Sequence, residues 1–259
     1  MSLLKGVLIA SVLTVVAARY LAPLPARPLG ALPPGLSIPV RGAFHIHTNR
    51  SDGTGTPDQV ATAAAAAGLK FVILTDHDDG SHEVDKPQYR NGVLCIDAVE
   101  ISTGGGHVVG LDLPRSSYPL GGEARDVLED IRRLGGFAIA AHPGSPKPEL
   151  RWTDWNVPIG GLEWLNGDSE WRDESPWLLV RALFTYPVRR TESVATLLDR
   201  PDAVLRQWDT LTQTRRVVGL AAADAHARIG LRTMGEPYDT GASLHLPEYE
   251  DSFRAFSPT

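Results

Sequence analysis

Six of the eight histidines in this chain lie in five short clusters that also contain carboxylates, and each cluster closes or follows an apolar, strand-like run. The nine side chains are His45, His47, Asp52, His77, Glu100, His107, His142, Asp224 and His226. Neutral imidazole and ionised carboxylate are the groups that bind borderline and hard divalent cations. Nine of them exceed what one ion can use, so the sequence predicts two or three ions. Any fold of this chain must therefore bring the ends of distant strands together.

From residue 40 onward, strand-like runs alternate with helical patterns. The predicted strands are 40–47, 70–75, 93–102, 107–113, 137–141, 159–165 and 216–223, and the predicted helices are 58–67, 123–134, 176–184 and 201–211. Pro57 marks the start of the first helix, after Thr56 as its expected N-cap. This alternation favours parallel βαβ units, and the glycines at 104–106 predict a hairpin. In α/β barrels, sites form at the carboxyl ends of the strands. We count about seven strands, one fewer than in the commonest barrel, and so expect a distorted seven-stranded α/β barrel.

The length of 259 residues suits one such barrel or two smaller domains. The formal net charge is -6, and no basic stripe with interleaved aromatic residues is present, so we expect no nucleic-acid partner. An anionic substrate would then depend on the local positive charge of bound metals. The single cysteine, Cys95, excludes an intramolecular disulfide, and its apolar run predicts a buried position.

The N-terminal segment differs in composition from the rest of the chain. An uncharged stretch of 13 residues lies between Lys5 and Arg19. It is shorter than the ~20 residues of a bilayer span and typical of a signal-peptide core. A cleaved signal, a short uncleaved membrane anchor and an ordinary buried helix all remain open, because no clean cleavage site follows. Export or anchoring would place the catalytic part outside the cytoplasm, with the membrane as a partner if the segment stays attached.

Six prolines between residues 23 and 39 predict a stiff, extended linker. The expected organisation is a signal or anchor at 1–22, a proline-rich linker at 23–39 and the catalytic domain at 40–259.

Five motifs occur in a specific order: His45-x-His47-Thr48-x-x-Ser51-Asp52-Gly53, Thr75-Asp76-His77, the Glu100 to His107 segment, His142-Pro143 and Asp224-x-His226. In that order they resemble the polymerase and histidinol phosphatase (PHP) family of metal-dependent phosphoesterases. Each motif alone occurs by chance, whereas five in the family's order are specific. The resemblance extends from residue 44 to residue 226, nearly all of the chain after the linker.

The resemblance implies a distorted (β/α)7 barrel of TIM-barrel-like type with a trinuclear centre at its mouth. It assigns the first metal to His45, His47, Glu100 and Asp224, the second to Glu100, His107 and His142, and the third to Asp52, His77 and His226. Some relatives have histidine where this chain has Asp52. Because carboxylate favours Mn²⁺ or Fe²⁺ over Zn²⁺ more than imidazole does, the choice among these metals stays open. The N-terminal segment and the run 166–171 suggest an exported branch of the family.

The expected catalytic residues are Glu100, His107 and Asp224. A bridging carboxylate such as Glu100 holds two cations ~3.5–4 Å apart, and a water between them is deprotonated near neutral pH. Arg228 and, more weakly, Arg172 are candidates for binding an anionic substrate, with a solvated surface charge as the alternative for each. Asp76 could orient the imidazole of His77.

The favoured function is hydrolysis of a small phosphorylated molecule. Amide or carbamate hydrolysis at the same site and a non-catalytic, metal-bound module at the membrane are the alternatives. No Gly-x-Ser-x-Gly motif is present, and the lone cysteine lies within a strand-like run, so a serine or cysteine nucleophile has no support.

Overall fold

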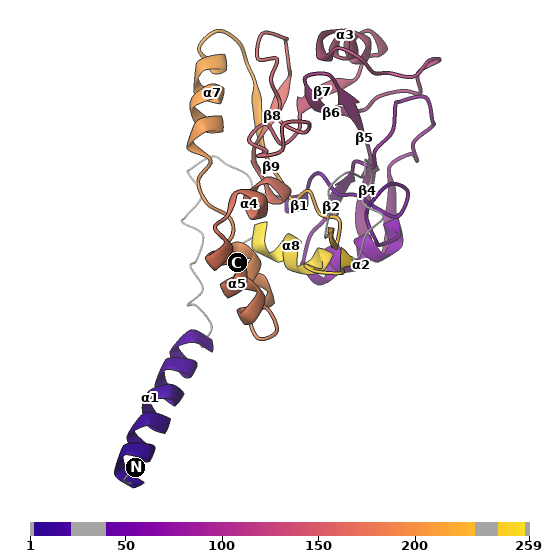
Figure 1. Ribbon diagram of the computed structural model, residues 1–259. Coiled ribbons are helices and arrows are strands. Elements are labelled where there is room, and N and C mark those ends of the chain that lie inside the picture. The colour runs from indigo at the N-terminus through magenta and orange to yellow at the C-terminus, as the bar shows by residue number, and fades with distance from the viewer. Residues whose placement is uncertain (1–2, 22–39, 231–242, 257–259) are drawn as a thin grey trace, which may run out of the picture.

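The computed structural model of the chain describes residues 3–21, 40–230 and 243–256 (Figure 1). The predicted linker at 23–39 lies outside these ranges. Helix α1 (Leu3–Leu21) contains the uncharged N-terminal stretch, and its side chains Val12 and Leu13 are exposed. Within the described ranges, no helix combines the length and apolar character that crossing a membrane requires.

The described residues from 40 onward form a mixed α/β structure with two main sheets. The first has the order β1-β2-β4-β3, with β1 (Gly42–Ala43), β2 (Phe71–Leu74) and β4 (Val93–Asp97) parallel and β3 (Gln88–Arg90) antiparallel at the edge. The second runs β5 (Val99–Thr103), β6 (Gly106–Leu111), β7 (Phe137–Ala140), β8 (Gly161–Asn166), β9 (Val218–Ala222). Its first three strands are antiparallel and its last three parallel. A small ribbon pairs β10 (Ile229–Gly230) with β11 (Ser243–Leu244).

The strand ladders do not close into one continuous barrel within the described residues. The run 93–102, predicted as a single strand, breaks at Ala98, and its two halves belong to different sheets. Among the described residues, two single bridges join the sheets, Ile46 with Ala225 and His77 with Glu100. Several residues next to these bridges have positive φ, including His45 at 63° and Asp224 at 45°. A left-handed residue cannot continue a β-ladder, so the sheets are interrupted there.

The predicted hairpin at 104–106 is present between β5 and β6. Gly106 has a φ of 112°, and a Cβ atom there would lie 2.8 Å from the carbonyl oxygen of Arg151. Only glycine fits this turn, because it accepts positive φ and leaves room for the neighbouring chain.

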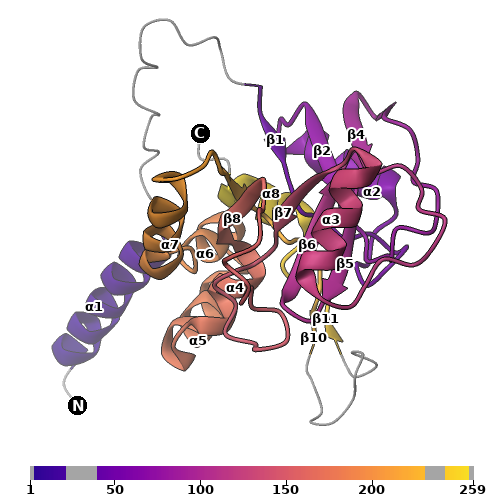
Figure 2. The ribbon, with the colours of Figure 1, turned by 90° about the horizontal axis from the view of Figure 1, so that it is seen from above.

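Helices cover the outer faces of the sheets (Figure 2). Helix α2 (Pro57–Ala66) lies on the first sheet, and α3 (Ala124–Leu134), α4 (Gly167–Asp173) and α7 (Asp202–Thr212) lie on the second. Helix α6 (Arg190–Ala195) packs between α5 (Pro176–Thr185) and α8 (Tyr249–Phe256), and α8 also packs against α2. The predicted start of α2 is confirmed: Thr56 caps it in a capping box with Gln59. Helix α8 has no counterpart in the sequence prediction, yet Phe253 is fully buried beside α2.

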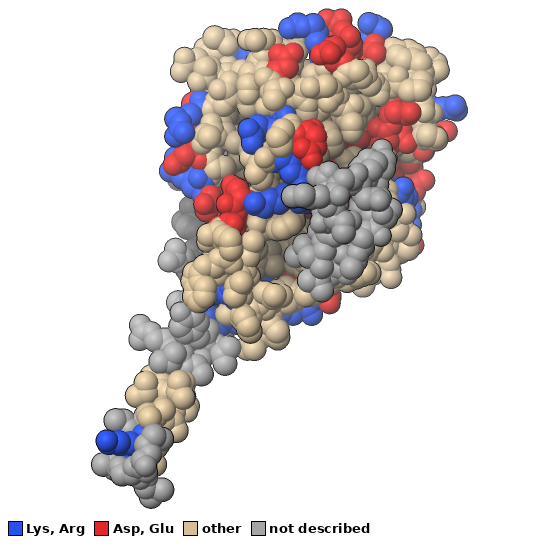
Figure 3. All heavy atoms as spheres, viewed as in Figure 1, with Lys and Arg blue, Asp and Glu red and all other residues tan. Residues whose placement is uncertain are grey.

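Two large apolar clusters lie under these helices, one around α3 and β5 to β8 and the other between the first sheet, α2 and α8. A third, smaller cluster packs side chains from both sheets together: Phe44, Ala98, Val109, Ile139, Ala141 and Ala222. Cys95 is buried, as predicted. On the face shown in Figure 3, lysine and arginine side chains are interspersed with aspartate and glutamate, so this face presents no field of one sign.

Candidate metal centre

The carboxylate of Glu100 is the point on which the histidines converge. It is 1% exposed and lies on β5, at the bridge that joins the two sheets. Its Oε1 atom lies 2.7 Å from His142 Nε2 and 2.9 Å from His107 Nδ1. Its Oε2 atom faces three other imidazoles, with ring nitrogens of His45, His47 and His77 at 3.1, 3.2 and 3.4 Å. Each oxygen thus meets a separate group of histidines.

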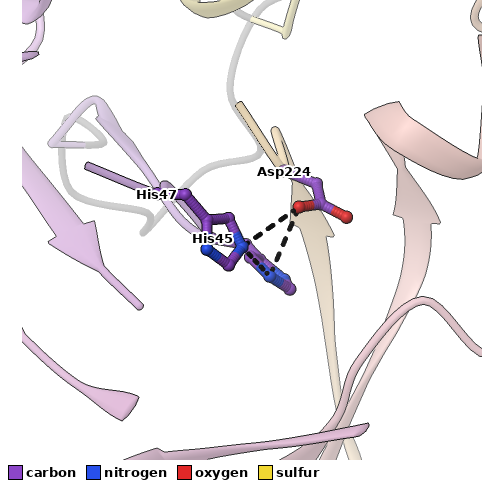
Figure 4. A group of neighbouring side chains, drawn as sticks. All are labelled: His45, His47 and Asp224. Atoms are coloured by element: carbon purple, nitrogen blue, oxygen red, sulfur yellow. Dashed lines mark hydrogen bonds and ion pairs between the residues drawn. The ribbon is translucent and has the colours of Figure 1, made fainter. Parts of the chain in front are cut away.

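Asp224 forms a second group with His45 and His47, which point toward one another in Figure 4. Its Oδ1 atom lies 3.4 Å from Nε2 of each histidine, and the two Nε2 atoms are 3.0 Å apart. The two histidines follow β1 and the aspartate follows β9, so the ends of strands from two different sheets meet here. All three side chains are buried.

A third group lies on the more open side of the site. Asp52 Oδ2 is 3.3 Å from His226 Nε2 and 3.9 Å from His77 Nε2. The side chains of Asp52 and His77 are 47% and 35% exposed, in contrast to the buried Glu100. The ring of His226 stacks on that of His47 at 4.1 Å between centroids.

The structure therefore brings all nine predicted side chains together. Four sets of three present ligand atoms within 4.8 Å of one another: His45, His47 and Asp224; His45, Glu100 and His142; His47, Asp52 and His226; and His47, His77 and Glu100. His107 belongs to none of these sets, although it contacts Glu100. Its Nε2 atom lies 3.2 Å from Ser102 Oγ. The assignment of individual ligands to individual ions stays a prediction.

The pKa values in the site follow from the burial of imidazoles and carboxylates close to one another. Burial alone would lower the pKa of His47, but hydrogen bonds to Asp224 and Glu100 raise it to about 10. Burial would raise the pKa of Glu100, whereas the charges of His45 and His77 hold it well below its usual range. Imidazole protons thus compensate buried carboxylates. Divalent cations can take the same place, because the converging nitrogen and oxygen atoms are their preferred ligands.

Three of the nine residues have an uncommon backbone conformation. The φ angles are 63° at His45, 30° at His142 and 45° at Asp224. Non-glycine residues with positive φ cost ~1–3 kcal/mol each and cluster at functional sites. At these positions each strand stops and the side chain lies in the cluster, which explains why the ligands occur at strand ends.

Sequence reasoning missed two buried residues that support this centre. Glu163 on β8 accepts from His45 Nδ1 at 2.5 Å and, through its other oxygen, from the backbone N–H of His142 at 2.6 Å. Asn166 donates to Glu163 at 2.8 Å and to Asp224 Oδ2 at 3.0 Å. The signal was present in the sequence, because Glu163 is a charged residue inside the apolar strand 159–165.

Asp76 does not play the role expected of it. Its oxygens accept hydrogen bonds from the backbone and hydroxyl of Thr48 and from Ser51, all at 2.7 Å. It therefore holds the loop that carries Asp52 rather than the imidazole of His77.

The two predicted substrate-binding arginines lie in different settings. Arg172, on α4, pairs with Asp168 at 2.5 Å and stacks on the ring of Trp171. Arg228 is partly buried, two residues after His226. Substrate binding by either one stays a prediction.

The chain is similar in sequence to parts of known proteins. No family model matches the chain. The uncharacterized protein MJ1587 of Methanocaldococcus jannaschii is 32% identical over 120 residues, which is 41% of this chain and 70% of that protein. A 3′,5′-nucleoside bisphosphate phosphatase of Chromobacterium violaceum is 32% identical over 122 residues, 43% of each chain, so the match spans less than half of that relative. A two-domain Bacteroides vulgatus protein, described as containing a predicted PHP-like metal-dependent phosphoesterase, aligns with a TM-score of 0.36 and 21% identity, over 55% of this chain and 49% of that one.

Proposed function

Because the chain belongs to the polymerase and histidinol phosphatase (PHP) family, we propose that it is a metal-dependent phosphoesterase acting on a small phosphorylated molecule. One observation carries the proposal. The buried carboxylate of Glu100 has ring nitrogens of five histidines within 3.4 Å, two at one oxygen and three at the other. A carboxylate whose two oxygens face two sets of imidazoles is placed to bridge two cations.

Nine side chains would hold the metal ions, in the grouping that the family resemblance implies. Mn²⁺, Fe²⁺ and Zn²⁺ all suit this mixed set of imidazoles and carboxylates. Bound divalent ions supply a nucleophile by lowering the pKa of water and neutralise charge on a phosphoryl group.

Two neighbouring polar side chains hold the proposed ligands in position. Glu163 and Asn166 hold His45 and Asp224 from behind, at 2.5 and 3.0 Å. The exposed group of Asp52, His77 and His226 marks the side from which a substrate enters. Proton transfer at the leaving oxygen would fall to this open side, because Glu100 and Asp224 are buried.

We also propose that the two sheets are parts of one distorted (β/α)7 barrel. The bridge Ile46–Ala225 joins the ends of β1 and β9, the bridge His77–Glu100 continues the β2–β4 pairing into β5, and the cluster around Val109 packs side chains from both sheets. This ring would contain β1, β2, the consecutive strands β4 and β5 as one position, β6, β7, β8 and β9, which makes seven positions.

The substrate class can be tested directly. A chelator first removes metal ions from the purified full-length protein, which is then reloaded with Mn²⁺, Fe²⁺ or Zn²⁺ alone. Each sample is assayed with 4-nitrophenyl phosphate, with bis(4-nitrophenyl) phosphate, and with nitrophenyl carbamate and amide analogues. We expect metal-dependent release from the phosphate esters. Turnover of the carbamates or amides alone would assign the same site to the other reaction class, and turnover of none would favour a non-catalytic module.

Localisation outside the cytoplasm is a separate proposal that rests on the uncharged stretch in residues 6–18. A fusion of residues 1–40 to a reporter that is active only after export tests it. We expect export or membrane retention, and a soluble cytoplasmic reporter would contradict the proposal.

A further inference from the structure

A cavity of about 260 Å³ lies between the end of β8, helix α4 and the segment that leads into α7. Glu163 and Asn166, which hold His45 and Asp224, form the wall that it shares with the candidate metal centre. Trp164, Pro201, Ala203 and Val204 supply apolar surface. We call it the β8–α4 cavity. No role in the proposed hydrolysis uses its other residues.

The floor and the rim of the β8–α4 cavity are acidic. Glu170 lies in the floor and is 4% exposed, whereas Asp173 and Asp199 are exposed at the rim. Glu170 accepts one hydrogen bond, from the backbone N–H of Asp199 at 2.8 Å. In the described part of the chain no lysine or arginine pairs with these three carboxylates; the lining Arg200 pairs with Asp202 instead, at 2.9 Å.

An unsatisfied hydroxyl lines the same cavity. Ser169 is 5% exposed, and its Oγ atom has no hydrogen-bond partner among the described residues. Buried polar groups are nearly always paired, so an orphaned hydroxyl at a cavity wall indicates a missing partner. A ligand that donates hydrogen bonds and carries positive charge would satisfy this hydroxyl and compensate the carboxylates of the same cavity.

The spacing of the carboxylates distinguishes an organic cation from a metal ion. At the metal centre, sets of three ligand atoms lie within 4.8 Å of one another, but no such set is formed by Glu170, Asp173 and Asp199. Acids spread around a partly open cavity with one aromatic wall suit a larger, weakly hydrated cation with an apolar body.

We propose that the β8–α4 cavity binds the protonated amine of a small organic ligand, with Glu170 and Ser169 receiving the ammonium group and Trp164 lying along its carbon chain. The amine belongs either to a separate ligand or to the alcohol part of the phosphate ester. Only the second case rests on the proposed function.

The test is calorimetric titration of the full, metal-loaded protein with n-butylammonium chloride, with 1-butanol as the uncharged probe. We expect saturable binding of the amine and none of the alcohol. Glu170→Gln keeps the acceptor for the Asp199 N–H, yet it should weaken amine binding about ten- to a hundredfold, because a charged hydrogen bond is lost. Glu129→Gln, an exposed carboxylate on α3, is the matched control and should bind as wild type.

Equal binding of 1-butanol, or amine binding unchanged by Glu170→Gln, would overturn the proposal. So would displacement of the amine by magnesium chloride in a Glu170-dependent manner, which would make the cavity a metal site. If Glu170→Gln fails to fold, the exposed rim variants Asp173→Asn and Asp199→Asn decide the question by the same weakening.

The source of the amine is decided by comparing 2-aminoethyl phosphate with ethyl phosphate as substrates. A lower KM for the amino ester that disappears in Glu170→Gln assigns the amine to the substrate. Equal KM values alongside amine binding assign it to a separate ligand. If no phosphate ester is hydrolysed, the proposed function fails while the calorimetry still decides the cavity.

Discussion

Glu163 Oε1 lies 2.5 Å from Nδ1 of His45, and both side chains are fully buried. The contact requires the His45 proton on Nδ1, because a carboxylate only accepts hydrogen bonds. In the neutral ring, Nε2 would then carry the lone pair, and a cation could take the place of the Nε2 proton next to the carboxylates of Glu100 and Asp224, which lie at 3.1 and 3.4 Å from it. A carboxylate behind a histidine thus selects the tautomer that can bind a metal.

Replacing Glu163 with Gln should weaken metal binding more than it lowers the maximal rate. The amide would turn an N–H donor toward either the His45 ring or the backbone N–H of His142, which both need an acceptor. We expect the metal concentration for half-maximal activity to rise about 10- to 100-fold, with activity recovered at saturating metal. Glu129→Gln serves as control, and an unchanged metal requirement would remove the positioning role of Glu163.

Replacing Glu100 with Gln should abolish metal binding and nearly all hydrolysis. Five imidazoles would then face a neutral amide that cannot bridge two cations. We expect the rate to fall by about three orders of magnitude or more, with an unchanged circular dichroism spectrum. Elemental analysis of the purified variant measures the metal. Full activity in this variant would exclude a bridging role.

Chelation should destabilise the protein as well as inactivate it. Ions that bind only the folded state add RT ln(1 + [L]/Kd), about 2.7 kcal/mol at a hundred times Kd. We expect a lower Tm after treatment with EDTA, and recovery of Tm and activity with one of Mn²⁺, Fe²⁺ or Zn²⁺. Identical thermal transitions and rates with and without chelator would contradict a metal requirement.

The carboxyl group of Glu170 should make the protein less stable as pH rises from about 4.5 to 7. Burial, with Asp173 and Asp199 nearby, raises its pKa to about 7 in the folded state. The folded state therefore binds this proton more tightly than the unfolded state, and the penalty is complete above pH 7. Glu170→Gln should be more stable than wild type at pH 8, by up to about 3 kcal/mol, and should not be at pH 4.5.

Urea denaturation at both pH values measures this difference. Glu129→Gln should show no comparable change between pH 4.5 and 8. An equal stability change at both pH values for Glu170→Gln would show that the raised pKa does not contribute.

Local patterns predicted much of the fold correctly. The N-cap at Thr56, the hairpin at 104–106 and the burial of Cys95 all depend on neighbours close in sequence or on apolar character. Features that depend on tertiary packing were not predicted. The run 93–102 has mostly apolar residues on both sides of Ala98 and contains no glycine or proline, so no turn signal marks the break there, where the chain passes from one sheet to the other. Helix α8 is stabilised by packing of Phe253 and by the Tyr249 hydroxyl, which donates to the carbonyl of His47 at 2.8 Å.

The sequence by itself determined which donor groups are present and that most of them follow strand ends, because residue type and apolar patterning are local properties; Glu100 and His107 lie within β5 and β6 instead. Tertiary structure alone decided how those groups share Glu100 and Asp224, and that Glu163 and Asn166 hold them from behind. These relationships join residues up to about 180 positions apart, and they arise only where several strands end at one place. Burial at that place also sets the charges, because the pKa of each group depends on neighbours that the sequence does not reveal.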